Sequence, residues 1–194
     1  NEPQYICGLK KCDFQTTING KKTDLYILKN KSGNEVAITN YGGAIQAIMI
    51  PDKNGNHANV IQGHDNINSV INSPAPYLST LIGRYGNRIS KGKFQLNGKE
   101  YQLPINNGPN SLHGGINGFN KKVWDALMMN NETLILNYVS SYGEEGYTGE
   151  VKVTVEYTFN DNNELIIEYM ATTNKKTIIN LTSHGYFSLT GISD

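Results

Sequence analysis

The sequence predicts an almost all-β protein, built as a layered antiparallel β-sandwich, and three observations support this fold class. Asn-Gly pairs, which readily take the positive φ angles of tight hairpin turns, recur along the chain. Several segments alternate apolar and polar residues with the two-residue period of a strand. No window of about a dozen residues keeps the 3.6-residue period of a helix, so helices should be few.

The alternating segments identify the individual strands. The clearest pattern crosses Asn97-Gly98, where apolar residues on both arms of a hairpin alternate with polar ones. Residues 151–159 are apolar or aromatic at every odd position and precede a polar turn. Pro51 ends another strand, because proline cannot donate to a ladder. The predicted hairpins and strands lie at residues 94–103, at 151–159 with 165–170, at 24–28 with 35–39, and at 44–50.

The remaining segments predict short helical turns and long loops. Residues 68–72 and 77–82 resemble single helical turns, and residues 105–119, dense in Gly and Asn, form a long loop. Hairpins that each hide one face must stack on a second sheet, so we expect a sandwich whose loops carry the chemistry. The length and the 38% hydrophobic content predict a single domain over residues 1–194.

Composition excludes several classes of partner. The 17 basic and 17 acidic residues give a formal net charge of zero, so no long-range field attracts nucleic acid or an anionic membrane. The longest apolar stretch, residues 44–50, is far shorter than the roughly 20 residues of a membrane-spanning helix. We therefore expect neither a nucleic-acid partner nor a membrane span.

Compartment and redox state stay open at this point. Cys7 and Cys12 lie close together near one end, and both a bridge and two free thiols are compatible with that spacing. The sequence begins with Asn1 rather than Met. Removal of a signal segment would make the protein periplasmic or secreted, and otherwise it would be cytoplasmic.

Two of the four histidines stand in settings suited to chemistry. His113 lies in Ser111-Leu-His-Gly-Gly115, where two glycines leave room beside the imidazole for another molecule. His184 interrupts an apolar strand pattern, so it is either a hydrogen-bonded core histidine or a functional group. His57 is expected in an exposed turn, and His64 is ambiguous.

The segment Ile82-Gly-Arg-Tyr-Gly-Asn-Arg-Ile89, which contains two arginines, an asparagine and an aromatic ring, provides a third candidate element. Guanidinium groups suit the fixing of hydroxyls or a carboxylate, although a structural arginine that ties loops together is the alternative. We expect Arg84 to face the protein and Asn87 with Arg88 to face a ligand. The adjacent Glu144 and Glu145 should point apart into water. No C-x-x-C or helical ligand pair occurs, so we expect no metal.

With these motifs in their order and spacing, the chain resembles the aldose 1-epimerase (galactose mutarotase) family from about Asp13 onward. The matching segments are residues 40–43, 83–93, 110–115, 119–124, 143–147 and 180–187. The resemblance implies a large antiparallel supersandwich of the galactose mutarotase type with a sugar-binding cleft. It also implies interconversion of the α and β anomers of a free hexose, of the glucose or galactose type, without a cofactor.

Carried over residue by residue, the resemblance makes His184 the general acid that protonates the ring oxygen of the sugar. It makes Asn87, Arg88 and His113 substrate-binding residues that hold hydroxyls and the ring oxygen. Lys122 stands where the family more often has arginine.

One departure concerns the general base. In the family the base is a glutamate in a C-terminal portion, and nothing before Asp194 corresponds to it. We therefore expect this chain to be the N-terminal portion, with a sandwich incomplete at its C-terminus, where the remainder is either absent or supplied by another chain that completes the sheet. Residues 1–194 alone should then catalyse weakly or not at all. The alternatives are a non-catalytic carbohydrate-binding fragment and a hexose-6-phosphate 1-epimerase, which would need a basic cluster for its phosphate.

Overall fold

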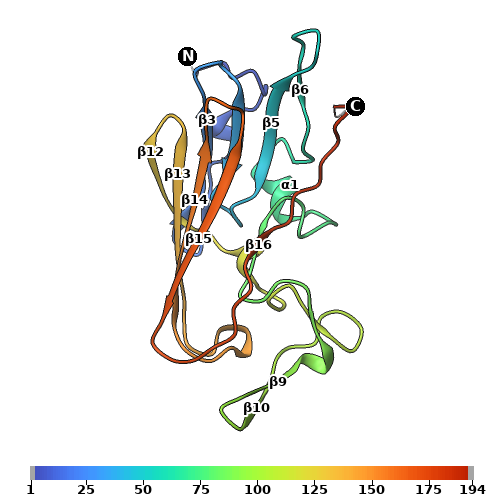
Figure 1. The fold of residues 1–194 in the computed structure, drawn as a ribbon, viewed down its shortest axis with the longest axis vertical. Coiled ribbons are helices and arrows are strands. Elements are labelled where there is room, and N and C mark those ends of the chain that lie inside the picture. Colours follow the sequence, from blue (N-terminus) through green and yellow to red (C-terminus); the bar gives the residue numbers. More distant parts are fainter. Residues whose placement is uncertain (1–2, 192–194) are drawn as a thin grey trace.

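A computed structural model describes residues 3–191, and its main elements are two four-stranded antiparallel sheets (Figure 1). The first sheet contains, in spatial order, β3 (Leu25–Lys29), β4 (Glu35–Thr39), β5 (Ile45–Pro51) and β6 (His57–Asn59). The second contains β12 (Asp125–Asn130), β13 (Thr133–Ser140), β14 (Val151–Phe159) and β15 (Leu165–Thr173). The prediction of an almost all-β antiparallel protein is confirmed.

Short strand pairs and helical turns connect the two sheets. The pairs are β1 (Thr17–Ile18) with β2 (Lys21–Lys22), β7 (Leu81–Ile82) with β16 (Thr182–Ser183), β8 (Arg88–Ile89) with β11 (Ser111–Leu112), and β9 (Lys93–Leu96) with β10 (Lys99–Gln102). The helices are η1 (Lys11–Phe14), α1 (Ile67–Ile71), η2 (Ser90–Gly92), η3 (Phe119–Lys121) and η4 (Glu144–Gly146). No helix within residues 3–191 is long and apolar enough to cross a membrane.

The predicted hairpins are present with the predicted turns. Strands β9 and β10 meet at Asn97-Gly98, β14 pairs with β15, and β3 pairs with β4. The predicted turn at residues 68–72 is helix α1, whose first turn is capped by Asn66 accepting from the Ser69 amide at 2.9 Å.

A helical turn over residues 77–82 is wrong. Tyr77 lies in an irregular turn, and Leu81 and Ile82 form β7 instead. Both side chains are buried and their backbones pair with β16, which lies about a hundred residues further on (182 − 82). A partner so distant leaves no local signal in the sequence.

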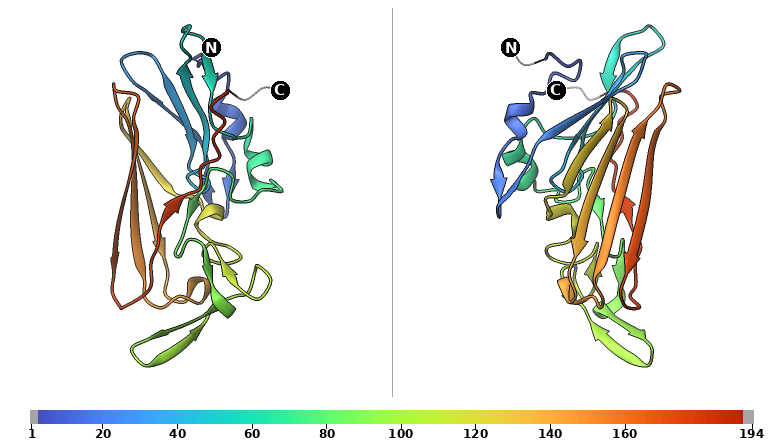
Figure 2. Two further views of the ribbon diagram at one scale, coloured as in Figure 1. Left: turned by 45° about the vertical axis from the view of Figure 1, so that its right-hand side comes forward. Right: turned by 90° about the vertical axis from the view of Figure 1, so that its left-hand side faces the viewer.

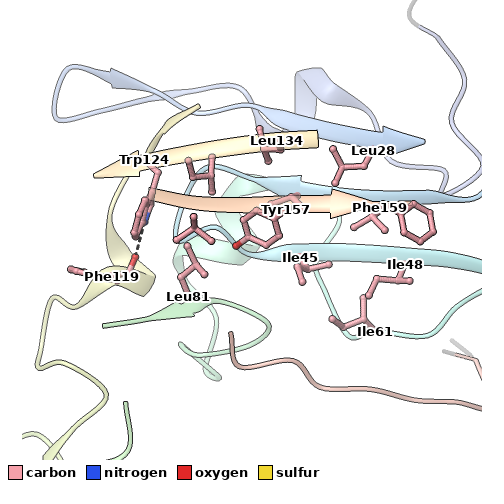
Figure 3. Packing of buried hydrophobic residues seen from close by; sticks show 14 of the residues in the cluster. Leu28, Ile45, Ile48, Ile61, Leu81, Phe119, Trp124, Leu134, Tyr157 and Phe159 are labelled. Atoms are coloured by element: carbon pink, nitrogen blue, oxygen red, sulfur yellow. Dashed lines mark hydrogen bonds between the residues drawn. The ribbon is translucent and has the colours of Figure 1, made fainter. Parts of the chain in front are cut away.

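The hydrophobic core fills the space between the two sheets (Figure 3). The odd residues of β14 point inward and are buried, as their alternation predicts. Tyr157 on this strand is fully buried, and its hydroxyl donates to the Gly43 carbonyl of the opposite layer at 2.8 Å. The Trp124 indole likewise donates to the Phe119 carbonyl, so the polar groups of these two buried aromatic side chains are paired.

A projecting hairpin lies apart from this core, and the second sheet ends in an edge strand. The β9–β10 hairpin projects away from both sheets, and β15 is an edge strand of the second sheet (Figure 2). Cys7 and Cys12 form no disulfide with each other.

Candidate functional site

The β8–β11 pair brings Asn87 and His113 together. Leu112 pairs with Arg88 in this ladder, so the residues just beyond it face each other. The His113 amide donates to the Asn87 carbonyl at 3.0 Å, and the Asn87 amide donates to Nδ1 of the His113 ring at 2.9 Å. The second bond leaves Nε2 as the proton-bearing nitrogen of the neutral ring.

The β7–β16 pair brings His184 to the same place. The His184 amide donates to the Thr80 carbonyl at 2.8 Å, and the Ser79 amide donates to the His184 carbonyl at 3.0 Å. Residues 81–89 thus pair first with β16 and then with β11, which His113 directly follows. The His113 and His184 rings meet edge to face with centroids 5.0 Å apart and an interplanar angle of 85°.

Two tyrosines complete the cluster around the imidazoles. The Tyr77 ring meets His113 edge-on at 4.7 Å and lies within 28° of parallel to His184 at 6.3 Å. Tyr186 stacks on His184 at 5.0 Å with an interplanar angle of 21°. We refer to Tyr77, His113, His184 and Tyr186 as the aromatic cluster.

Desolvation is the main electrostatic influence on His113. Partial burial, together with the nearby charges of His184 and Arg88, lowers the pKa of His113 from 6.5 to about 4. His113 is therefore neutral near pH 7, and its Nε2–H is a hydrogen-bond donor toward a ligand.

Arg88 and Asn87 add further donors on the exposed side of the cluster. Arg88 Nε donates to Asn107 Oδ1 at 2.9 Å, and its Nη1 donates to Asn87 Oδ1 at 3.3 Å. A guanidinium has five N–H groups, so three remain for a ligand (5 − 2). The side-chain nitrogen of Asn87, Nδ2, keeps both of its N–H groups for a ligand, because among residues 3–191 only the side-chain oxygen Oδ1 forms a hydrogen bond.

Arg84 faces the protein, as predicted, and it has a structural role. It is 2% exposed and donates to the Ser140 hydroxyl and to four backbone carbonyls. These bonds tie the segment before Asn87 to the second sheet. Asn87 and Arg88, by contrast, are exposed.

The two glycines after His113 do not clear space for a ligand, contrary to the expectation from sequence. A Cβ at Gly114 would lie 1.9 Å from the Gly83 carbonyl oxygen, and one at Gly115 would lie 2.6 Å from Glu145 Oε1. The missing side chains make room for the protein's own chain, because the loop packs against residues 83 and 145.

The two adjacent glutamates also differ from expectation. They point apart but not into water. Glu145 accepts from the Asn117 amide at 2.6 Å. Glu144 accepts from the Tyr138 and Ser140 hydroxyls and lies 3.5 Å from Lys122 Nζ. Both carboxylates therefore brace loops beside the site.

The other two histidines lie outside the cluster. His57 is exposed, as expected, but it is the first residue of strand β6 rather than part of a turn, and its Nε2 lies 2.8 Å from Asn34 Oδ1. The His64 amide donates to Gln46 Oε1, and desolvation lowers the pKa of His64. Neither ring touches His113 or His184.

The four predicted site residues thus lie together, and the tyrosines are the part that sequence reasoning missed. Tyr186 lies two residues after His184, and the two-residue period of an extended chain would place both side chains on the same side. That spacing could have identified it. Tyr77 had no such signal, because the sequence pattern predicted a helical turn at its position and the structure has a different turn there.

The arrangement places N–H donors beside a group of aromatic rings on one part of the surface. Such donors suit oxygen atoms of a neutral, hydroxylated molecule. His184 is the group of this cluster whose ring nitrogens are free of hydrogen bonds among residues 3–191, so it can exchange a proton with a ligand.

Comparison with known proteins agrees with this chemistry. A family model described as aldose 1-epimerase matches residues 24–194. The galactose mutarotase of Bos taurus is 45% identical over 156 residues, which cover 80% of this chain and 45% of that protein. The aldose 1-epimerase of Escherichia coli K12 is 31% identical over 173 residues, covering 89% of this chain and 50% of that protein.

Solved structures show the same fold. The aldose epimerase homologue of C. elegans superposes with a TM-score of 0.82 at 32% identity, covering 86% of this chain and 51% of that one. The galactose 1-epimerase of Lactobacillus acidophilus gives 0.79 at 26% identity, covering 89% and 51%. This chain spans about half the length of the relatives it matches.

Proposed function

The chain belongs to the aldose 1-epimerase family, and from that membership we propose that it acts on a free hexose of the glucose or galactose type. The reaction is interconversion of the α and β anomers by opening and closing of the pyranose ring. The observation that carries the proposal is the edge-to-face pair of His113 and His184, whose ring centroids are 5.0 Å apart.

His184 acts as the general acid in this proposal. It donates a proton to the ring oxygen while a base removes the proton of the anomeric hydroxyl, and the ring opens. The aldehyde then turns about its C1–C2 bond, and closure on the other face inverts the anomeric centre. Imidazole suits the acid because its ordinary pKa, about 6.5, lies near the working pH.

His113, Asn87 and Arg88 bind the sugar in this proposal. The depressed pKa of His113 keeps its Nε2–H as a neutral donor to a sugar oxygen. Arg88 and Asn87 supply N–H groups to hydroxyls from the exposed side. The four groups divide the work between one acid and three binding residues.

The described residues do not identify the general base, and this supports a second candidate function. Among residues 3–191, no carboxylate forms a hydrogen bond or ion pair with His113, His184 or Arg88. A chain with the acid and the binding residues but no base would bind sugar without catalysis. The second candidate is therefore a non-catalytic carbohydrate-binding module.

Polarimetry separates the two candidates. If the chain catalyses, alone or with a partner that supplies the base, freshly dissolved α-glucose or α-galactose should relax faster than in buffer, and His184→Ala should reduce the catalysed rate by about 10²–10⁴. Sugar binding by calorimetry without faster relaxation would favour the binding module. Catalysis that survives His184→Ala would overturn the assignment.

The same assay with a hexose 6-phosphate tests the third alternative. Arg88 is hydrogen-bonded to Asn87, one of the predicted binding residues, and Lys122 is engaged by Glu144. A phosphate site would need more basic groups. We therefore expect the free hexose to be the better substrate.

We further propose that another chain completes the second sheet. Strand β15 is an edge of that sheet, and Ile166, Tyr169 and Met170 on it are exposed. Phe187 and Leu189, which follow β16, are 63% and 86% exposed. A long edge strand with apolar side chains is a template for added strands.

A further inference from the structure

The contacts that hold the imidazole of His184 in place differ from those that hold the imidazole of His113. His113 is fixed by the hydrogen bond from the Asn87 amide to its Nδ1. Within residues 3–191, neither ring nitrogen of His184 has a hydrogen-bond partner, and only its backbone is bonded, to Ser79 and Thr80. A histidine that transfers protons is normally oriented through its second ring nitrogen. Another contact must therefore set the angle of this ring.

Aromatic rings make that contact. Tyr186 lies 21° from parallel to the His184 ring at 5.0 Å, and Tyr77 lies 28° from parallel at 6.3 Å. Tyr77 also meets the His113 ring edge-on at 4.7 Å, so it touches both imidazoles. Offset-stacked and edge-to-face pairs are the favoured geometries for such rings.

We propose that Tyr77, supported by Tyr186, is a positioning residue that holds the His184 ring at the angle required for proton transfer to the sugar ring oxygen. The inference rests on the proposed function for its chemistry. The orientation of the ring, however, can be measured without any catalytic activity.

Tyr77 can hold another ring because its own loop is tied down. The buried Asn120 donates to the Pro76 carbonyl at 2.9 Å, and the Thr80 amide donates to the Tyr77 carbonyl at 3.3 Å. The Ser79 amide joins this loop to the backbone of His184 itself. The loop and the backbone of His184 are therefore joined directly by hydrogen bonds.

The hydroxyl of Tyr77 does not contribute to the orientation of the His184 ring. Among residues 3–191 the Tyr77 hydroxyl has no hydrogen-bond partner, so the ring alone makes the contacts. Phenylalanine should replace Tyr77 without loss, whereas an aliphatic residue of similar bulk should not. This contrast separates ring stacking from any role of the hydroxyl.

The test compares Tyr77→Leu with Tyr77→Phe in protein labelled with ¹³C-histidine. In Tyr77→Leu the His184 ring protons should move downfield and broaden, because the ring current is lost and the imidazole samples other rotamers. The catalysed rate should fall about tenfold to 10²-fold through kcat, with KM within about twofold, as expected for a misplaced catalytic group. Tyr77→Phe should match the wild type in both readouts.

Two further variants complete the design. Tyr186→Leu removes the other stacked ring at an exposed position, so it decides the question if Tyr77→Leu does not fold. Tyr101→Leu removes a tyrosine stacked on Phe94 in the projecting hairpin, and it should change neither readout.

The outcomes distinguish this inference from the proposed function. Unchanged His184 signals in both Tyr77→Leu and Tyr186→Leu would overturn it, even if His184→Ala abolishes activity. If the wild type shows no catalysed mutarotation, the proposed function fails, and the histidine spectra alone decide whether the tyrosines orient the ring.

Discussion

The backbones of Asn87 and His113 exchange two hydrogen bonds, one of which ends on the His113 ring rather than on its carbonyl. Both residues have positive φ angles, 65° and 51°, which residues other than glycine rarely adopt. This unusual backbone turns Nδ1 toward the protein and leaves Nε2 for a ligand. The tautomer of a site residue is thus set by main-chain geometry.

The first prediction concerns the titration of His113. Because the pKa of His113 is about 4 in the folded chain and 6.5 when unperturbed, its ring should titrate near pH 4 by NMR. The unfolded chain then binds more protons between these values, so the free energy of unfolding rises with pH across that window. The contribution of His113 to the free energy of unfolding is therefore at its maximum above about pH 6.5 and decreases as the pH falls toward 4.

His113→Gln provides the control for this effect. The variant should show a shallower dependence of unfolding free energy on pH between 4 and 6.5, measured by urea denaturation at several pH values. Equal slopes in the two proteins would contradict the assignment. His64, whose pKa is also lowered, is present in both proteins and cancels in the comparison.

The second prediction concerns Gly114. Its φ of +87° and the 1.9 Å approach of a Cβ to the Gly83 carbonyl oxygen make Gly114→Ala strained and overpacked. Each effect costs about 1–3 kcal/mol, so we expect a loss of at least about 2 kcal/mol in the free energy of unfolding. Urea denaturation measures it.

Gly108→Ala is the matched variant. Gly108 also has a positive φ, +53°, but a Cβ there meets nothing within 4 Å. Its loss should be about 1 kcal/mol, since only the backbone conformation is unfavourable. If the two variants lose equal stability, the close approach to Gly83 has no energetic weight.

The local parts of this fold could be predicted from the sequence, and the non-local parts could not. Asn97-Gly98 and the alternation along β14 identify hairpins because turn chemistry and side-chain period are written within a few residues. Residues 81–82 have neither a characteristic turn nor a side-chain period that would identify them as a strand. Their strand exists because of a partner about a hundred residues away (182 − 82).

The candidate site shows the same division. His113, Arg88 and Asn87 stand out singly by composition, and the family resemblance grouped them with His184. Spacing alone does not bring His184 to His113, 71 residues apart (184 − 113), because two short strand pairs must form first. Tyr77 could not be found at all, since its turn has no distinctive pattern.

The third prediction separates the two arginines. Arg84→Lys keeps the charge but loses the planar fork that serves five acceptors, leaving buried carbonyls unpaired. An unpaired buried group costs about 1–3 kcal/mol, so the variant should lose about 3 kcal/mol or more of unfolding free energy. Thermal and urea unfolding provide the measurement.

Arg88→Lys should behave in the opposite way. Arg88 is exposed, so its replacement should change the unfolding free energy by less than about 0.5 kcal/mol. Its effect should instead appear as weaker sugar binding in calorimetry. A large loss of stability in Arg88→Lys, or none in Arg84→Lys, would show that the two roles are assigned wrongly.

The last prediction concerns the edge of the second sheet. In the absence of another partner, we expect two copies of the chain to associate through β15, because its exposed backbone and apolar side chains suit strand addition. Sedimentation velocity should show concentration-dependent self-association.

Met170→Lys, at a side chain that is 69% exposed, should shift the protein toward monomer, because a lysine on an edge strand opposes pairing. Met129→Lys on β12, the opposite edge, changes a methionine that is 56% exposed and should leave the association unchanged. Equal effects of the two substitutions would show that the surface around β15 is not the contact, and a monomer at all concentrations would remove the basis for self-pairing.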